Sequence, residues 1–253
     1  MFNWIYKIYF YIRMIFDFLQ CNKQLKIVKK LDTPETIAER DALVAKVTKW
    51  WASRVFEFSK TTVNIVGDEN IPKDGAVVFV GNHQSLMDIH ILLANCKKKL
   101  SFMGKMELTK VPLISEWMRV MQCTFISRSD RRQSIEAMQE AVDKLKNGYS
   151  TVIFPEGTRS HGGPIGEFKK GSFKLAFRAE VPIVPVTIDG TWQLLGKKSR
   201  NAVCNLTIHK PIYTAGLTKD EKSELPEQIE QIVKSALPVE RLNPKPPKKK
   251  HKK

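Results

Sequence analysis

The segment 81–88 contains a histidine and an aspartate, His83 and Asp88, whose spacing could support proton transfer. A histidine acts as a general base when one ring nitrogen faces the substrate and a carboxylate holds the other. In a turn that enters a helix, Asp88 could fix the tautomer of His83 and stabilise its imidazolium. The sequence pairs no serine or cysteine with them, which leaves a hydroxyl of the substrate as the nucleophile. Taken alone, the pair also fits an ordinary structural turn.

A second polar cluster, FPEGTRS at 154–160, combines a carboxylate, a glycine turn and a guanidinium. The Arg159 guanidinium can hold a phosphate through two parallel hydrogen bonds. Glu156 could accept a hydrogen bond from a hydroxyl or orient that arginine. A salt-bridged turn is the alternative. The residues expected to bind phosphate are Glu156, Gly157, Thr158 and Arg159.

Further cations follow other strand-like runs. In FISRSDRR, Arg128 ends a short apolar run and is the natural second phosphate ligand, whereas Arg131 and Arg132 fit solvated charge. Lys105, in SFMGKMEL, also follows a strand-like run. We therefore expect Lys105 to add another candidate cation on the same edge of the fold.

These clusters need a scaffold that brings them together. From residue 61 onward, short strand-like runs alternate with helical ones, which predicts an α/β domain with a largely parallel sheet flanked by helices. Active sites of such sheets lie outside the carboxyl ends of the strands, where both motifs fall. The expected strands are 62–66, 76–80, 100–103, 124–127, 151–154, 183–188 and 204–209. The expected helices are 88–94, 113–120, 133–146, 173–179 and 218–237.

The N-terminus is rich in aromatic residues and isoleucine, but Lys7, Arg13 and Asp17 interrupt it. The apolar runs are therefore shorter than the roughly 18 residues of a spanning helix, and no signal-peptide cleavage site is present. The polar residues fall within an arc of roughly 140°, which predicts an amphipathic helix in a membrane interface. A helix packed on its own domain is the alternative. The expected membrane anchors are Trp4, Ile8, Phe10, Ile15, Phe16 and Leu19.

A second helical stripe, ending near residue 60, would form a hairpin with this helix. Its Trp50 and Trp51 suit a membrane interface, although core packing explains the stripe equally well. We expect a membrane-binding hairpin at 1–60, an α/β domain at 61–238 and a basic tail at 239–253. The tail ends in KPPKKKHKK and cannot bury apolar surface, so we expect it to be disordered, either solvated or bound to anionic lipid.

The composition fits a globular chain with an anionic partner. The 253 residues are 42% apolar and 27% charged, and their formal net charge is +16. Such an excess indicates nucleic acid, an acidic membrane surface or phosphorylated substrates as partners. The four cysteines form no CxxC pair, so the sequence indicates neither a disulfide framework nor a zinc site, which fits a reducing compartment.

Together, these motifs resemble the blocks of the glycerolipid acyltransferases of the 1-acylglycerol-3-phosphate (lysophosphatidate) type. The blocks are N-H-x4-D, here Asn82, His83 and Asp88; a short strand that ends in an arginine, here Arg128; F-P-E-G-T-R-S, matched letter for letter at 154–160; and a proline-containing apolar strand, here 181–186. All of them occur in the family's order. The resemblance covers residues 1 to about 237 and leaves the lysine-rich end without a counterpart.

The resemblance implies transfer of a fatty acyl group from acyl-CoA or acyl carrier protein to the free sn-2 hydroxyl of lysophosphatidic acid, giving phosphatidic acid in phospholipid biosynthesis. His83 would take the proton of this hydroxyl and Asp88 would orient His83, without an acyl-enzyme, a cofactor or a metal. Lys105, or backbone N–H groups beside it, would stabilise the oxyanion. The acceptor phosphate would lie near Arg128 and the FPEGTRS turn.

Because the acceptor and the product reside in a bilayer, the resemblance also implies a monotopic or peripheral membrane protein, at the cytoplasmic face of the cell membrane. An apolar helix and basic charge would supply the two signals that stable attachment requires. Two alternatives stay open. Glycerol 3-phosphate or another lysophospholipid could be the acceptor, because the blocks are shared. A non-catalytic protein that binds membrane or nucleic acid also fits the charge, but no nucleic-acid recognition motif is present.

Overall fold

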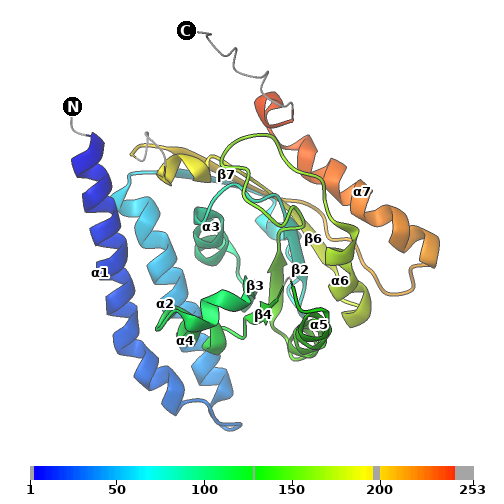
Figure 1. The fold of residues 1–253 in the computed structure, drawn as a ribbon, viewed down its shortest axis with the longest axis horizontal. Coiled ribbons are helices and arrows are strands. Elements are labelled where there is room, and N and C mark those ends of the chain that lie inside the picture. The colour runs from blue at the N-terminus through cyan, green and yellow to red at the C-terminus, as the bar shows by residue number, and fades with distance from the viewer. Residues whose placement is uncertain (1–2, 128, 196–199, 243–253) are drawn as a thin grey trace.

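This computed structural model of the chain describes residues 3–127, 129–195 and 200–242. Arg128 and most of the basic tail at 239–253, which both carry sequence-based expectations, lie outside the described residues. Figure 1 shows a central sheet with helices packed on both of its faces.

Within the described residues, seven strands form one sheet in the order β1-β7-β6-β2-β5-β3-β4. Neighbouring strands are parallel except for β6 and β7, which are antiparallel. The predicted α/β fold with a mostly parallel sheet is therefore confirmed. The strand bounds are β1 Thr62–Val66, β2 Val78–Gly81, β3 Leu100–Lys105, β4 Thr124–Ile126, β5 Ser150–Ile153, β6 Ile183–Asp189 and β7 Val203–Ile208.

Helices form a layer on each side of the sheet (Figure 1). One layer contains α1 Asn3–Lys30, α2 Ile37–Phe58, α3 Met87–Asn95 and α4 Ile114–Val120. The other layer contains α5 Arg131–Lys146, α6 Lys174–Ala179 and α7 Lys219–Ser235. Four short 3-10 segments lie between the described elements and a fifth, η5, follows α7: η1 Asp68–Asn70, η2 Met106–Lys110, η3 Lys170–Phe173, η4 Thr191–Leu195 and η5 Val239–Arg241.

The central strand β2 contributes to both hydrophobic cores. Phe79, together with Val77 just before the strand, packs in the core that contains α2 and α3, whereas Val78 and Val80 pack in the core that contains α5, α6 and α7. Successive side chains of a strand point to opposite faces, and both faces are covered here. A strand covered on both faces reads as a continuous apolar run, which is the pattern of residues 76–80.

The first half of α1 turns its charged residues towards the protein, whereas the lysines of its second half are exposed. Asp17 is 2% exposed and pairs with Arg13 of the same helix at 3.1 Å and with Arg54 of α2 at 3.6 Å. The opposite charge on α2 explains why this side of α1 faces the protein. The expected membrane anchors that stay exposed are Trp4, Ile8, Ile15, Phe16 and Leu19. None of the described helices has the length and apolar content needed to cross a bilayer.

The expectation that Phe10 is a membrane anchor is wrong. Its side chain is 1% exposed and packs edge-to-face on Phe58 of α2, with ring centroids 5.1 Å apart. Residues three or seven apart share one helix face, so Phe10 projects on the same side as Lys7, Arg13 and Asp17. That side is buried against α2, which makes Phe10 a core residue.

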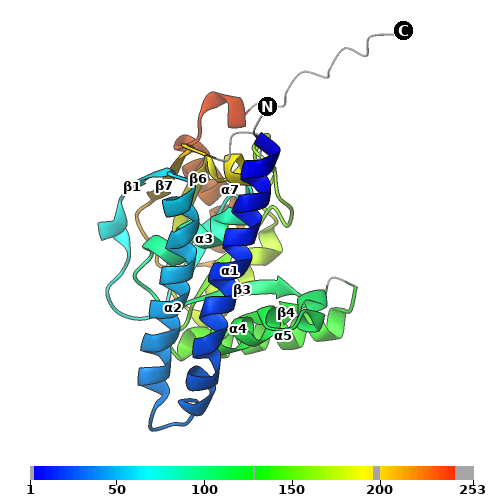
Figure 2. The ribbon, with the colours of Figure 1, turned by 90° about the vertical axis from the view of Figure 1, so that its left-hand side faces the viewer.

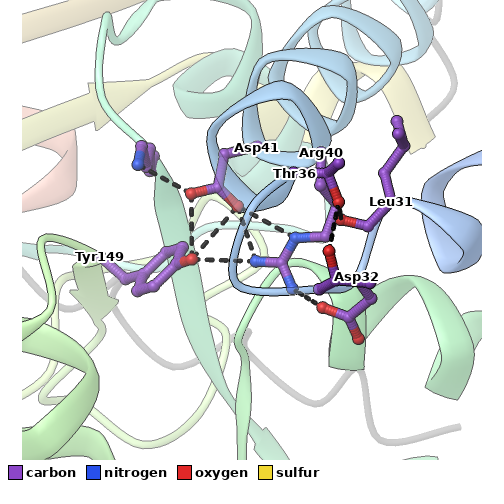
Figure 3. Close-up of polar contacts among 8 residues, drawn as sticks. Leu31, Asp32, Thr36, Arg40, Asp41 and Tyr149 are labelled. Atoms are coloured by element: carbon purple, nitrogen blue, oxygen red, sulfur yellow. Dashed lines mark hydrogen bonds and ion pairs between the residues drawn. The ribbon is translucent and has the colours of Figure 1, made fainter.

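A buried polar cluster fixes the start of α2 to the sheet (Figure 3). Arg40 is 1% exposed and donates to Asp41 and Asp32 at 2.6 Å. Asp41 also accepts from Lys99 Nζ at 2.7 Å and from the Tyr149 hydroxyl at 3.0 Å. Burial alone raises the pKa of Asp41, but the hydrogen bonds that it accepts outweigh burial and lower this pKa. The cluster therefore keeps its charges paired inside the protein.

This cluster lies at the end of the sheet opposite the polar motifs. Lys99 directly precedes β3 and Tyr149 directly precedes β5, so both lie at the amino ends of parallel strands. From there α2 runs towards the carboxyl ends of β2, β5 and β6, because β1, which follows α2, is parallel to β7, and β7 is antiparallel to β6. Figure 2 shows α1 and α2 side by side along this direction. The exposed anchors at the start of α1 therefore lie at the carboxyl end of the sheet.

Candidate active site

Three loops begin side by side at the carboxyl ends of β2, β5 and β6. Strand β2 pairs in parallel with β5 on one side and with β6 on the other. Parallel sheets commonly place their binding sites at this edge. Asn82 joins the ends of two of these strands, since its side chain hydrogen-bonds both the carbonyl and the N–H of Ile188 at 2.8 Å.

The His83 ring and the Asp88 carboxylate are in direct contact. His83 Nδ1 lies 2.7 Å from Asp88 Oδ2. The same oxygen accepts the backbone N–H groups of Gln84 and Ser85 at 2.6 and 2.9 Å, and Oδ1 accepts the Thr191 hydroxyl. Asp88 is 0% exposed, so these hydrogen bonds replace the water that the carboxylate has lost. The carboxylate is thereby fixed in place and holds one nitrogen of the His83 ring.

Packing also fixes the plane of the His83 ring. The ring stacks on Phe154, with centroids 4.1 Å apart and planes 9° from parallel. Phe154 is the first residue of the FPEGTRS motif, so the end of β5 supports the imidazole. The His83 side chain is 18% exposed. With Nδ1 held by Asp88, Nε2 is the nitrogen that can reach a substrate hydroxyl.

Glu156 connects two loops of the site. It is 6% exposed; its Oε1 accepts the His83 N–H at 2.6 Å and its Oε2 accepts the Gly166 N–H at 2.7 Å. Burial raises the pKa of Glu156, and the two N–H groups oppose this rise. We expected Glu156 to contact a phosphate or to orient Arg159. Its oxygens are instead bound by backbone donors, because a buried carboxylate needs hydrogen-bond partners.

The remainder of the FPEGTRS turn is more open. Gly157 has a φ of 69°, a left-handed conformation that glycine adopts without strain. Thr158 and Arg159 are exposed. Arg159 lines a pocket of about 190 Å³. The other residues that line this pocket are Ser85, Leu86, His161, Trp192 and Leu195. The pocket therefore joins the Arg159 guanidinium to the loop that carries His83 and Asp88.

Lys169, which lies outside the motifs considered above, also approaches the FPEGTRS turn. A Cβ placed on Gly157 would lie 3.0 Å from Lys169 Nζ. The backbone N–H of Lys169 bonds the carbonyl of Pro155 at 3.2 Å, which holds this segment beside the turn. Lys169 is exposed, so its ammonium adds positive charge next to the loop of Arg159. The lysine pair in FKKGS at 168–172 was the available sequence signal.

The residues that the structure describes do not place two of the expected cations, Lys105 and Arg128, at this site. Lys105 ends β3 and is exposed, and β5 lies between β3 and β2 in the sheet. Arg128 lies outside the described residues. Their roles stay predictions. Among the residues that the structure describes, no cluster of three or more His, Cys, Asp or Glu side chains could hold a metal ion.

Sequence reasoning missed the loop that follows β6. Thr191 bonds the buried carboxylate of Asp88, and Asp189 accepts the side-chain amide of Gln84 at 2.8 Å. The Gly190 N–H in turn donates to the Gln84 side chain at 2.9 Å. The signal was present in IDGT at 188–191, where polar residues follow a strand end as they do in the two recognised motifs.

Comparison with known proteins agrees with this geometry. A buried carboxylate that holds a histidine beside a cationic turn, at the carboxyl ends of parallel strands, defines an α/β protein with a site suited to proton transfer. The sequence pattern of the acyltransferase family matches residues 62–189. The chain therefore belongs to the acyltransferase family.

Individual relatives extend the match beyond this region. The chloroplastic 1-acyl-sn-glycerol-3-phosphate acyltransferase LPAT1 of Arabidopsis thaliana is 35% identical over 193 residues, which cover 73% of this chain and 53% of that protein. A 1-acyl-sn-glycerol-3-phosphate acyltransferase of Borreliella burgdorferi is 34% identical over 177 residues, which cover 67% of this chain and 70% of that protein. The chain spans about half the length of the plant relatives that it matches.

A solved structure shares nearly the whole fold. The crystal structure of the 1-acyl-sn-glycerophosphate (LPA) acyltransferase PlsC from Thermotoga maritima superposes with a TM-score of 0.77 at 33% sequence identity. The match covers 92% of this chain and 93% of that one, so it includes the N-terminal helices as well as the sheet.

Proposed function

We propose that this protein transfers a fatty acyl group from a thioester to the free sn-2 hydroxyl of lysophosphatidic acid, giving phosphatidic acid for phospholipid biosynthesis. Membership of the acyltransferase family and the names of the relatives support this reaction. The observation that carries the proposal is the contact of 2.7 Å between His83 Nδ1 and the fully buried Asp88 carboxylate.

In the proposed mechanism the acceptor hydroxyl is the nucleophile. Its oxygen attacks the thioester carbonyl while His83 Nε2 takes its proton, and Asp88 stabilises the resulting imidazolium through Nδ1–H. The tetrahedral intermediate then breaks its carbon–sulfur bond, and the departing thiolate receives the proton from His83. The products are the new ester and the free thiol. Lys105, or a backbone N–H group beside it, is the proposed donor to the oxyanion.

Positive charge beside the FPEGTRS turn would hold the acceptor phosphate. Arg159 can form two parallel hydrogen bonds to phosphate, and Lys169 adds a point charge beside Gly157. Thr158 can donate its hydroxyl from the same turn. Arg128 keeps the phosphate-binding role that the family resemblance implies. We assign Glu156 to bracing the turn against the His83 loop, since backbone N–H groups take up both of its oxygens.

The exposed apolar face of α1 supports attachment to a membrane. Trp4, Ile15 and Leu19 are 64%, 60% and 51% exposed, although burying such side chains is worth about 1.5–3 kcal/mol each. The start of this face, at Trp4 and Ile8, lies at the end of the sheet that carries His83. We propose that the hairpin at 1–60 docks the domain at 61–238 on the anionic cytoplasmic face of the cell membrane. Basic residues near such a surface would add about 1 kcal/mol each.

A matrix of donors and acceptors tests the proposed reaction. Purified protein would be given acyl-CoA or acyl carrier protein thioesters together with lysophosphatidic acid, glycerol 3-phosphate or another lysophospholipid. We expect the highest kcat/KM with lysophosphatidic acid and no requirement for an added cofactor. Equal or faster turnover of glycerol 3-phosphate would overturn the proposed acceptor, and the two donor series would identify the carrier.

Substitution of the histidine tests the mechanism. His83→Ala should lower kcat by about 10²–10⁴-fold, the usual contribution of a general base. His161 is exposed and lines the pocket beside Arg159, whereas Asp88 bonds His83, so His161→Asn is the matched control for loss of a histidine and should retain kcat whatever its effect on KM. Near-normal turnover by folded His83→Ala protein would contradict the mechanism.

A further inference from the structure

Arg241, which lies beyond α7 and outside every recognised motif, contacts several parts of the active-site rim. Its Nε donates to Asp189 Oδ1 at 3.0 Å, its Nη1 donates to the Gly162 carbonyl at 2.8 Å, and its guanidinium carbon lies 5.1 Å from the centre of the Trp192 ring. Its own carbonyl accepts the Ile165 N–H at 2.9 Å. The side chains of Arg241 and Asp189 are 16% and 13% exposed, so the pair is better shielded than a surface ion pair.

One set of these contacts leads towards the catalytic pair. Asp189 Oδ1 also accepts the side-chain amide of Gln84 at 2.8 Å. The backbone N–H of Gln84 donates to the Asp88 carboxylate at 2.6 Å. Asp189 therefore holds the end of β6 against the loop that carries His83 and Asp88, and Arg241 supports Asp189 from the other side of the same oxygen.

A second set of contacts leads to the walls of the pocket beside Arg159. Trp192 and Arg159 line the same pocket. Gly162 lies so close to Trp192 that a Cβ on Gly162 would lie 2.4 Å from the indole ring. Arg241 bonds the Gly162 carbonyl and stacks on Trp192, so one side chain holds both walls.

We propose that Arg241 is a positioning residue, which sets the spacing between the 158–163 loop and the 189–195 segment and so places Arg159 for the acceptor phosphate. The Asp88 carboxylate has its own donors in His83, Gln84, Ser85 and Thr191, so it stays fixed when Arg241 is removed. The 158–163 loop and the 189–195 segment are each bound to the 83–88 loop, through the Ser160 N–H on the His83 carbonyl at 2.8 Å and through the Thr191 hydroxyl on Asp88. Arg241 adds a direct polar link between these two walls, because it bonds both Gly162 and Asp189. Loss of Arg241 should therefore weaken binding of the acceptor more than it slows the chemical step.

Steady-state kinetics of Arg241 variants test this role. Arg241→Met keeps the aliphatic stem but removes the donors, and should raise KM for lysophosphatidic acid about tenfold, as expected when hydrogen bonds to a charged group are lost. We expect kcat to change by less than about threefold and KM for the acyl donor to stay constant. Arg241→Lys should give a KM for lysophosphatidic acid between those of wild type and Arg241→Met. An ammonium can pair with Asp189 but lacks the guanidinium fork that also reaches Gly162. Arg178→Met, on the exposed side of α6, is the matched control.

This inference rests on the proposed role of Arg159 in phosphate binding, and a separate variant tests that role. An unchanged KM for lysophosphatidic acid in Arg159→Ala would overturn the phosphate site itself. Hydrogen exchange of the 158–165 amides reads the effect of Arg241 without any substrate. We expect faster exchange there in Arg241→Met than in wild type and in Arg178→Met. Unchanged exchange, or a loss of kcat with KM unchanged, would overturn the assignment of Arg241.

Discussion

The charged residues of the site fall into two groups, those that are held and those that are open to a ligand. Asp88 and Glu156 are buried, and both accept backbone N–H groups, so their positions are fixed before a substrate arrives. Arg159 and Lys169 are exposed beside the same loops. Fixed dipoles that need no rearrangement are the most effective way to stabilise developing charge. The acidic residues of the motifs thus accept hydrogen bonds from the protein, whereas the basic ones are exposed, as the proposed phosphate site requires.

Two neighbouring lysines allow a test of the charge beside Gly157. Lys169→Met should raise KM for lysophosphatidic acid about five- to tenfold, because one charge-assisted hydrogen bond to the phosphate is lost. Lys170→Met removes an equal charge from the next residue, which is also exposed, and should change KM less than about twofold. Steady-state kinetics at fixed ionic strength compare the two. An equal rise in both variants would indicate general electrostatic attraction instead of a specific contact.

At the scale of elements, the sequence specified the sheet better than the loops. The strands were predictable because a strand that helices cover on both faces of the sheet is a continuous apolar run, bounded by turn residues. The segment 76–80 is one example, and its end placed His83 correctly at the carboxyl edge. The contacts of Asp189, Thr191 and Arg241 were not predictable, since each depends on loops brought together from distant parts of the chain.

Helix α1 offers paired substitutions that separate folding from membrane attachment. Phe10→Ala should lower the free energy of unfolding by about 3–5 kcal/mol, as for other buried aromatic residues. Ile12 is 59% exposed, so Ile12→Ser should change stability by less than about 0.5 kcal/mol. Urea unfolding measures both values.

In a vesicle-binding assay, Ile12→Ser should have the larger effect and Phe10→Ala the smaller one, the reverse of their effects on stability. Ile12→Ser should weaken sedimentation with anionic phospholipid vesicles about tenfold or more, because a large apolar contact is lost. Folded Phe10→Ala should bind nearly as well as wild type. Equal binding by Ile12→Ser and wild type would show that this face does not touch the bilayer.

Helix α3 carries a buried histidine that should make stability depend on pH. The His90 ring packs on Trp51 of α2 with centroids 4.3 Å apart. Burial lowers the pKa of His90 from 6.5 to about 4, although a contact with the Leu86 backbone opposes this shift. A lowered pKa means that the fold favours neutral imidazole. Its contribution to stability is therefore complete above pH 6.5 and is lost as the pH falls towards about 4.

This linkage predicts a measurable slope. Between about pH 7 and pH 5, His90 should account for a loss of about 2 kcal/mol in the free energy of unfolding. His90→Leu should remove that part of the pH dependence, whereas His161→Asn should leave it in place because His161 is exposed. Urea unfolding at the two pH values measures the slopes. Parallel pH profiles for wild type and His90→Leu would contradict the prediction.

At the scale of the whole molecule, the hairpin and the sheet are joined by a polar cluster at one end and by apolar packing along their length. Arg40→Met would remove the guanidinium from buried Asp41 but leave it Lys99 and the Tyr149 hydroxyl, which should lower the free energy of unfolding by about 1–3 kcal/mol. Arg132→Met removes the ion pair with Glu136, in which the arginine is 90% exposed. This change should alter the free energy of unfolding by less than about 1 kcal/mol. Because the cluster lies at the amino ends of the strands, folded Arg40→Met protein should keep the wild-type KM. A changed KM would show that the two ends are coupled.

The inward charges of α1 have a thermodynamic consequence for attachment. Asp17 is paired with Arg54, and Phe10 is packed on Phe58, so the rotation of α1 about its own axis is set by the folded protein. A free amphipathic peptide must lose conformational entropy when it orders on a bilayer. Here that loss has already occurred during folding, so the proposed membrane contact would be made by a rigid surface. Attachment should therefore proceed without an increase in helix content, unlike that of a peptide made from residues 3–30.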